Sequence, residues 1–165
     1  MSYQAEKVTK AILDLLQSSM ESALTAVETL WQADPIELGE VQNWQFGHSP
    51  TVIERPKGDF PIISVIPGPS DPQESSDQWI LSVSYYEVFV DVFQADDDET
   101  KVVKKLLRYC EAILAIFEAN HQIGDGGKQV LLPTVDPSDV SRQHVEGMAI
   151  EYFTQWARIS VVMEL

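Results

Sequence analysis

Apolar residues recur at steps of three and four residues in two stretches of the chain, and this spacing predicts amphipathic helices. The first stretch runs from Tyr3 to about Trp31 and stops before Asp34-Pro35. The second runs from about Asp98 to Asn120, and four acidic residues, Asp96–Glu99, stand at its start. Acidic side chains stabilise the N-terminal end of a helix. The sequence therefore predicts two long helices.

Runs rich in β-branched and aromatic residues predict strands elsewhere in the chain. The run from Phe60 to Ile66 predicts a strand that ends at Pro67, because proline cannot donate to a strand ladder. Two longer runs, Trp79 to Phe93 and Met148 to Leu165, predict long strands. We also expect short strands over Thr51–Ile53 and Gln129–Thr134, and polar loops over Pro67–Gln78 and Asp136–Gly147.

The order of these elements predicts the fold class. Helix, strand, hairpin, long strand, helix, strand and long strand is the order of an α+β protein. We expect an antiparallel or mixed sheet with long strands, packed against two long helices. The chain has 165 residues, which is the size of one ordinary domain, so a single domain spans residues 1–165.

The buried face of each long strand changes partway along its length. In the run from Trp79 to Phe93, the apolar residues fall on odd positions up to Tyr85 and on even positions from Tyr86. The closing strand changes face near Gln155 to Ala157. Because side chains alternate along a strand, such a change requires a bend, a bulge or a second covering surface. For the first strand we expect a bend or bulge near Ser84 to Tyr86.

The two halves of that first strand are expected to meet different surfaces. A flat strand that buried its first half would also bury Glu87 and Asp91, at a cost of several kcal/mol for each unpaired carboxylate. These two acids are therefore expected in water or opposite a cation such as Arg158. The apolar residues of the first half are left for a neighbouring subunit, on a surface separate from Val88 and Val90. The expected oligomer or partner interface comprises Trp79, Leu81, Val83, Tyr85, Glu87, Asp91 and Arg158.

Composition and charge narrow the range of functions that the protein could have. Eleven basic residues against 26 acidic ones give a formal net charge of −15, which disfavours binding to nucleic acid or to a membrane surface. One cysteine cannot form an intramolecular disulfide, so a reducing compartment is expected. No apolar run approaches the roughly 20 residues of a membrane span. We expect a soluble, unprocessed protein.

Three segments contain residue types found in metal-binding, phosphate-binding or catalytic motifs, but none has the residue spacing that the motif requires. The acidic run Asp96–Glu99 lacks the alternating acids, central glycine and closing glutamate of a calcium loop. The segment Gly124–Lys128 lacks the first glycine and the Ser or Thr of a phosphate-binding loop. Glu87 and Asp91 would lie about 13 Å apart on a strand, too far for paired-carboxylate chemistry.

The residue types that bind zinc are scattered along the chain. Cys110 is the only thiol, and it falls at a core-facing helical position. His48, His121 and His144 have none of the short spacings of a zinc site. We therefore expect no catalytic residue, no metal, no cofactor and no enzymatic activity.

Four segments together resemble one protein family. They are the opening helix Ala5 to Leu30, the Arg55-Pro56 and Phe60–Val65 approach to a strand, the Tyr86–Phe93 strand that leads into the helix at Asp98, and the closing strand Trp156–Val161. In this order they resemble the tail terminator proteins of long-tailed bacteriophages, and more loosely the related neck and tail-completion proteins.

This resemblance implies a structural role without a reaction. It implies a homo-hexameric ring that caps the tail tube, stops its growth and joins it to the neck. The implied partners are the tail tube protein, a neck or head-completion protein and, in some tails, the sheath. DNA would pass through the ring without specific binding, and the protein would be assembled in the host cytoplasm and reside in the virion.

Two other function classes stay open at this stage. A small α+β enzyme or ligand-binding domain would need a pocket with convergent titratable groups. A small acidic cellular adaptor would present a β edge or an acidic loop to one partner.

Overall fold

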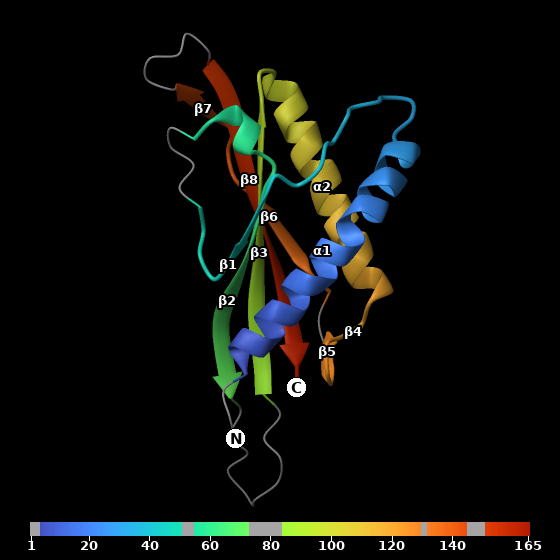
Figure 1. Ribbon diagram of the computed structural model, residues 1–165, viewed down its shortest axis with the longest axis vertical. Coiled ribbons are helices and arrows are strands. Elements are labelled where there is room, and N and C mark those ends of the chain that lie inside the picture. The colour runs from blue at the N-terminus through green and yellow to red at the C-terminus, as the bar shows by residue number, and fades with distance from the viewer. Residues whose placement is uncertain (1–3, 51–54, 73–83, 130–131, 145–150) are drawn as a thin grey trace, which may run out of the picture.

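The computed structural model describes residues 4–50, 55–72, 84–129, 132–144 and 151–165. Two long helices, α1 (Ala5–Leu30) and α2 (Glu99–Ala119), lie on the same side of a mixed sheet (Figure 1). The strands are β1 (Asn43–Phe46), β2 (Ile62–Pro72), β3 (Ser84–Asp96), β4 (Gln122–Ile123), β5 (Gly127–Gln129), β6 (Thr134–Pro137), β7 (Ser141–His144) and β8 (Glu151–Glu164), and a short 3-10 turn spans Lys57–Asp59. The α+β fold class is confirmed.

Three long strands form the centre of the sheet. The order is β1-β2-β3-β8, with β5, β6 and β7 placed one after another along the far edge of β8 and β4 beside β5. Strand β1 runs parallel to β2, and every other pair is antiparallel. The sheet is therefore mixed, with its longest ladder between β3 and β8.

The start of α2 agrees with the prediction from its acidic run. Asp98 is the N-cap, and its carboxylate accepts a hydrogen bond of 2.9 Å from the backbone N–H of Lys101. This contact satisfies one of the amides that a helix leaves free at its first turn. The acidic run is thus used as a helix cap.

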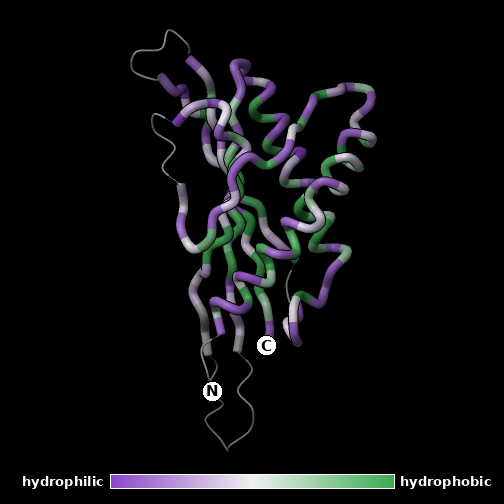
Figure 2. Tube along the Cα trace, viewed as in Figure 1, coloured by the Kyte–Doolittle hydropathy of each residue, from purple (hydrophilic) through white to green (hydrophobic). Residues whose placement is uncertain are grey.

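The main core lies between the helices and the sheet. In Figure 2, hydrophobic segments of the helices and of the long strands face one another across this space. Even positions of β3 and odd positions of β8 point into it, which is the alternation expected of a strand with one covered face. Its buried residues include Val8, Ile12, Leu16, Met20 and Leu24 of α1, Leu106, Tyr109, Cys110, Ile113 and Phe117 of α2, and Val65, Val88, Val90, Val92, Ile159, Val161 and Met163 of the sheet.

A second, smaller apolar cluster covers the opposite face at one end of the sheet. It contains Phe60, Ile62, Phe93, Ala95 and Tyr152. The register of β3 on β8 is continuous from Tyr85 opposite Glu164 to Asp96 opposite Phe153. The change of buried face in β8 therefore occurs at the predicted place without a bulge, because both faces of the sheet are covered there.

Strand β2 differs from its prediction. It continues past Pro67 to Pro72, so the expectation of a strand end at Pro67 and of a loop directly after it was wrong. Strand β1 pairs only with Ile62–Val65, so beyond Val65 the described chain places no strand on the outer edge of β2. On such an edge a missing proline N–H costs no ladder hydrogen bond.

The irregularity expected in the first long strand lies in its neighbour instead. The register of β2 on β3 shifts between Pro67 and Ser70, opposite Val88 and Tyr86. Strand β3 itself is regular over its described length. Residues 79–83, the first part of the predicted strand, lie outside the described residues.

The polar stretch near the C-terminus also forms strands. The expected loop over Asp136–Gly147 was wrong, because it contains the end of β6 and all of β7, both paired with β8. Polar edge strands lack the apolar alternation by which strands are recognised. The strand expected over Gln129–Thr134 is divided into the end of β5 and the start of β6. The strand expected over Thr51–Ile53 lies outside the described residues, and β1 and β4 were not predicted.

Candidate interaction surface

The face of the sheet that points away from the helices, here called the outer face, carries the predicted interface residues that the structure describes. Its side chains are in register across the three long strands. Ile62, Phe93 and Trp156 form one row, Ser64, Asp91 and Arg158 the next, and Ile66, Phe89 and Ser160 a third. The tight ladder of β2, β3 and β8 holds these rows in fixed positions.

A buried ion pair lies in the middle row. Arg158 donates one hydrogen bond from Nε to Asp91 Oδ1 and a second from Nη2 to Asp91 Oδ2, both at 2.8 Å. The Asp91 side chain has no exposed surface, whereas the Arg158 side chain is about one-third exposed. The hydrogen bond that Arg158 donates to Asp91 raises the pKa of Arg158 above its ordinary value, and this outweighs the opposite effect of burial. This arrangement is the bidentate pairing that suits guanidinium and carboxylate groups.

One end of the outer face is closed by the chain that follows β1. Ser49 donates to Asp91 Oδ2 at 3.0 Å, and the Ser64 hydroxyl donates to the carbonyl oxygen of His48. Farther along, the Tyr152 hydroxyl donates to the carbonyl oxygen of Arg55. The first two contacts hold His48 and Ser49 over the outer face. They also give hydrogen-bond partners to Ser64 and Asp91, which explains how these two polar side chains can be buried there.

The other half of the outer face retains exposed apolar and aromatic groups. Ile66, Tyr85, Phe89 and Val162 are each partly exposed. The Arg158 guanidinium carbon lies 4.4 Å from the centre of the Phe89 ring, which is the geometry of a cation–π contact. This half, which we call the open half, combines these apolar and aromatic groups with the anchored cation and with three partly exposed polar residues, Glu87, Ser160 and Glu164.

Trp156 lies on the closed side of the outer face, in the row of Ile62 and Phe93 next to the Arg158 row. It is 38% exposed, and its ring is stacked on that of Phe93, with centroids 5.9 Å apart. The indole is thus held in place from one side while its edge is accessible to a partner.

The predicted interface residues divide into three groups. Tyr85, Glu87 and Arg158 lie on the outer face and are partly exposed. Asp91 lies on the same face but is fully buried, so it positions Arg158 and does not itself form surface. The remaining three, Trp79, Leu81 and Val83, lie outside the described residues.

Sequence reasoning missed Phe89, Trp156 and Ile66 as members of this surface. Phe89 shares the odd positions of its strand with Tyr85, Glu87 and Asp91, so the alternation itself carried the signal. Which strands lie beside it could not be read from the alternation, and Ile66 is placed there only by the pairing of β2 with β3.

The remaining titratable groups give no indication of a reactive centre in the described chain. Burial raises the pKa of the Cys110 thiol to about 12, which disfavours a nucleophilic thiolate. Within the described ranges, no three His, Cys, Asp or Glu side chains converge as metal ligands would. No helix in these ranges has the length and apolar character needed to cross a membrane.

Comparison with known proteins gives similarity at the level of structure and not of sequence. No protein-family model matches the chain, and no curated protein is similar enough in sequence to match. Among solved structures, the chain is similar to one from the virion of a native gene transfer agent particle, with a TM-score of 0.38 and 15% sequence identity. The alignment covers 98% of this chain and 99% of that one.

Proposed function

We propose that this chain is a structural virion protein of the tail-terminator type. It forms a ring, a homo-hexamer, at the head-proximal end of a phage tail tube, where it terminates tube growth and joins the tail to the neck. Its function is carried by surfaces and not by a chemical reaction.

The positions of the four family-like segments support the proposal. The opening helix is α1, the closing strand lies within β8, the second segment leads into the start of β2, and the third is part of strand β3, which leads into α2. Each segment lies in, or leads directly into, one of the two helices and three long strands that supply most of the main core. The sequence resemblance therefore covers the elements that define the fold, and not peripheral loops.

The open half of the outer face is the observation that carries the proposal. Tyr85, Phe89 and Val162 are partly exposed on a rigid ladder. A second copy of the chain seated on this half would remove them from water, and burial stabilises by about 25 cal/mol per Å². In a ring, each copy offers one surface and receives a different one, and the contacts close on themselves.

The strongly acidic composition is compatible with a channel for DNA. A net charge of −15 per chain repels the phosphate backbone, so DNA would pass such a ring without specific binding. The proposed partners are the tail tube protein, the neck or head-completion protein and, where the tail has one, the sheath. The proposed location is the virion, after assembly in the host cytoplasm.

A tube-growth assay tests this function. Purified tail tube protein is allowed to polymerise with and without the chain, and tube lengths and tube ends are measured by electron microscopy. We expect shorter tubes with a ring at one end only. Tubes of unchanged length with bare ends would overturn the proposal, and a chain that stays monomeric and binds a small ligand would favour the ligand-binding alternative.

A further inference from the structure

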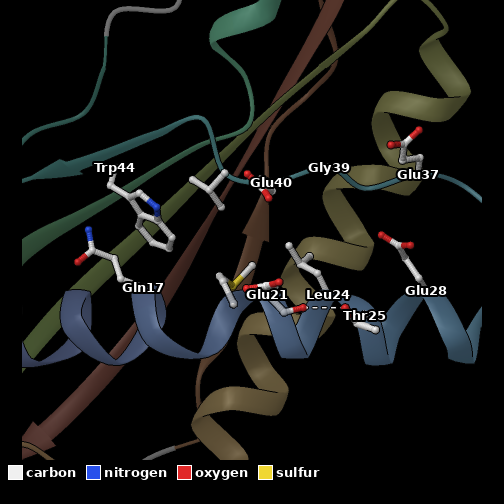
Figure 3. A pocket seen from close by; sticks show the side chains of 11 residues that line it. Gln17, Glu21, Leu24, Thr25, Glu28, Glu37, Gly39, Glu40 and Trp44 are labelled. Carbon is white, nitrogen blue, oxygen red and sulfur yellow. Dashed lines mark hydrogen bonds between the residues drawn. The ribbon is translucent and has the colours of Figure 1, made fainter.

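A groove of about 450 Å³ lies beside α1, on the side of the molecule formed by the segment that leads into β1. Its size falls in the range of pockets that bind ligands. One wall is a stripe of α1 that includes Glu21, Leu24 and Glu28, and the other is residues 37–44, here called the strap (Figure 3). The groove is separate from the outer face, which lies on the opposite side of the sheet.

Four carboxylates rim this groove. Glu21 and Glu28 project from α1, and Glu37 and Glu40 project from the strap across from them (Figure 3). Seven residues separate the two on α1, which is about 10 Å along a helix axis. Among the described residues that line the groove there is no Lys, Arg or His. The four negative charges therefore face a common space without a cation in its lining.

The strap is held in place, so the groove is preformed. The Tyr109 hydroxyl donates to the carbonyl oxygen of Gly39 at 2.6 Å, and the backbone N–H of Leu38 donates to Glu28 Oε1 at 3.4 Å. Gly39 has a φ of +71°, which favours glycine at this turn of the strap. Burial raises the pKa of Tyr109, and the charges of Glu28 and Glu40 act in the same direction.

The floor of the groove is apolar between the carboxylates. Met20 and Leu24 of α1 form its base, and Val41 and Trp44 of the strap are partly exposed along it. Lys and Arg side chains pack their aliphatic stems on such surfaces while the charged ends reach polar groups. An indole also attracts cations over its ring face. The lining is therefore complementary to a basic side chain along its whole length.

Other occupants fit the groove less well. A single metal ion is disfavoured because no three carboxylates of the described chain converge on one point. Nucleic acid would be repelled by four negative charges. A second copy carries the same net charge, and two lysines of its α2 are already paired, Lys104 with Asp34 at 2.8 Å and Lys105 with Asp96 at 2.6 Å.

We propose that this groove docks an extended basic segment of a different protein, with two cationic side chains on one face of the segment, their charged ends about 10 Å apart, and an apolar side chain between them on the same face. One cation lies between Glu21 and Glu40, the other between Glu28 and Glu37, and the apolar residue covers Leu24. This inference is independent of the ring, because it concerns a single chain and a surface on the opposite side of the sheet.

A peptide-binding experiment tests the proposal. The probe is a short acetylated and amidated peptide with the pattern Lys-x-Leu-x-Lys, in which the lysine and leucine side chains share one face of an extended chain, and with a fluorophore at one end. Binding is measured by fluorescence anisotropy at about 50 mM salt, where exposed charges are weakly screened. We expect the double variant Glu37→Gln/Glu40→Gln to weaken binding about tenfold, since it removes one carboxylate from each cation site.

A matched control separates the groove from the general acidity of the chain. Glu118→Gln/Asp125→Asn removes the same two charges from exposed positions outside the groove lining, and it should change the affinity less than about twofold. Circular dichroism of both variants checks that they fold. Equal weakening by the two variants, or no binding of the peptide to the unmodified chain, would overturn the proposal. An altered oligomeric mass of the groove variant would also overturn it, by assigning the groove to contacts between copies.

Discussion

Arg158 and Asp91 stand directly opposite each other on β8 and β3, and the guanidinium group holds both carboxylate oxygens at 2.8 Å. Their burial is unequal, because the carboxylate is fully buried and the guanidinium group reaches the open half of the outer face. The buried Asp91 carboxylate therefore holds the partly exposed Arg158 guanidinium group in a fixed position at the surface. Arg158 in turn lies over the ring of Phe89, so the pair also places a cation against that aromatic side chain.

Breaking the pair from the arginine side should be costly. Arg158→Met leaves the Asp91 carboxylate buried with a hydrogen bond from the Ser49 hydroxyl but without its cation, and we expect a loss of about 3 kcal/mol in the free energy of unfolding. The double variant Arg158→Met/Asp91→Asn should recover part of that loss, because no buried charge is left unpaired. Urea denaturation measures both values, and a loss below about 1 kcal/mol for the single variant would contradict this account of the pair.

The Asp96 carboxylate should make the stability of the fold depend on pH. Burial alone would raise its pKa, but hydrogen bonds from Lys105 and from the backbone of Asp98, with the charges of Lys105 and Lys101, hold the pKa below 3.8. Because the pKa of Asp96 is lower in the folded than in the unfolded protein, the ionised carboxylate stabilises the fold. This contribution to the free energy of unfolding is fully present above about pH 4 and is lost as the pH falls through the pKa of the folded protein. Asp96→Asn should therefore cost about 1–2 kcal/mol at pH 6 and less at pH 2.5.

Urea denaturation of both proteins at the two pH values checks the prediction for Asp96. An equal difference in free energy at pH 6 and pH 2.5 would assign the effect of the substitution to shape and not to charge.

The thiol of Cys110 should be unreactive in the folded protein. It is 3% exposed within the main core, and burial raises its pKa to about 12. A thiol reagent at pH 8 is expected to label one cysteine per chain only after urea is added. Rapid labelling of the native chain would place Cys110 in an accessible site and contradict the packing of α2 on the sheet.

The helices and strands that could be recognised from the sequence were those with a clear pattern of apolar residues. The apolar stripes of α1 and α2 and the β-branched runs of β2, β3 and β8 gave the fold class, because each buries one face against a common core. The Asp98 cap was recognised because its chemistry is local. The Asp91–Arg158 contact was expected as one of two outcomes for a carboxylate on a strand.

The parts that sequence did not supply depend on contacts between distant segments. The extension of β2 to Pro72 follows from its place at an edge, and β6 and β7 follow from the free side of β8. The acidic groove was not predicted, since Glu37 and Glu40 are opposite Glu21 and Glu28 only because Tyr109 holds the strap. Neither the pairing of these edge strands nor the facing of these carboxylates produces a periodic pattern in the sequence.

Two adjacent valines of β8 separate folding from assembly. Val161 is fully buried in the main core, whereas Val162 lies on the open half of the outer face. Val161→Asp should prevent folding, because a buried unpaired carboxylate costs several kcal/mol of a total stability of about 5–15 kcal/mol. Val162→Asp should leave a folded chain that assembles poorly. Circular dichroism and sedimentation velocity measure the two properties, and normal assembly of the Val162 variant would remove the open half from the interface.

The mass of the native assembly tests the central claim most directly. Native mass spectrometry of the unmodified chain, alone and mixed with tail tube protein, measures the number of 18.5 kDa copies in each particle. The proposed ring predicts a closed species of six copies, either in the protein alone or at the end of a tube. A chain that stays monomeric at micromolar concentration and in the presence of tubes would contradict it.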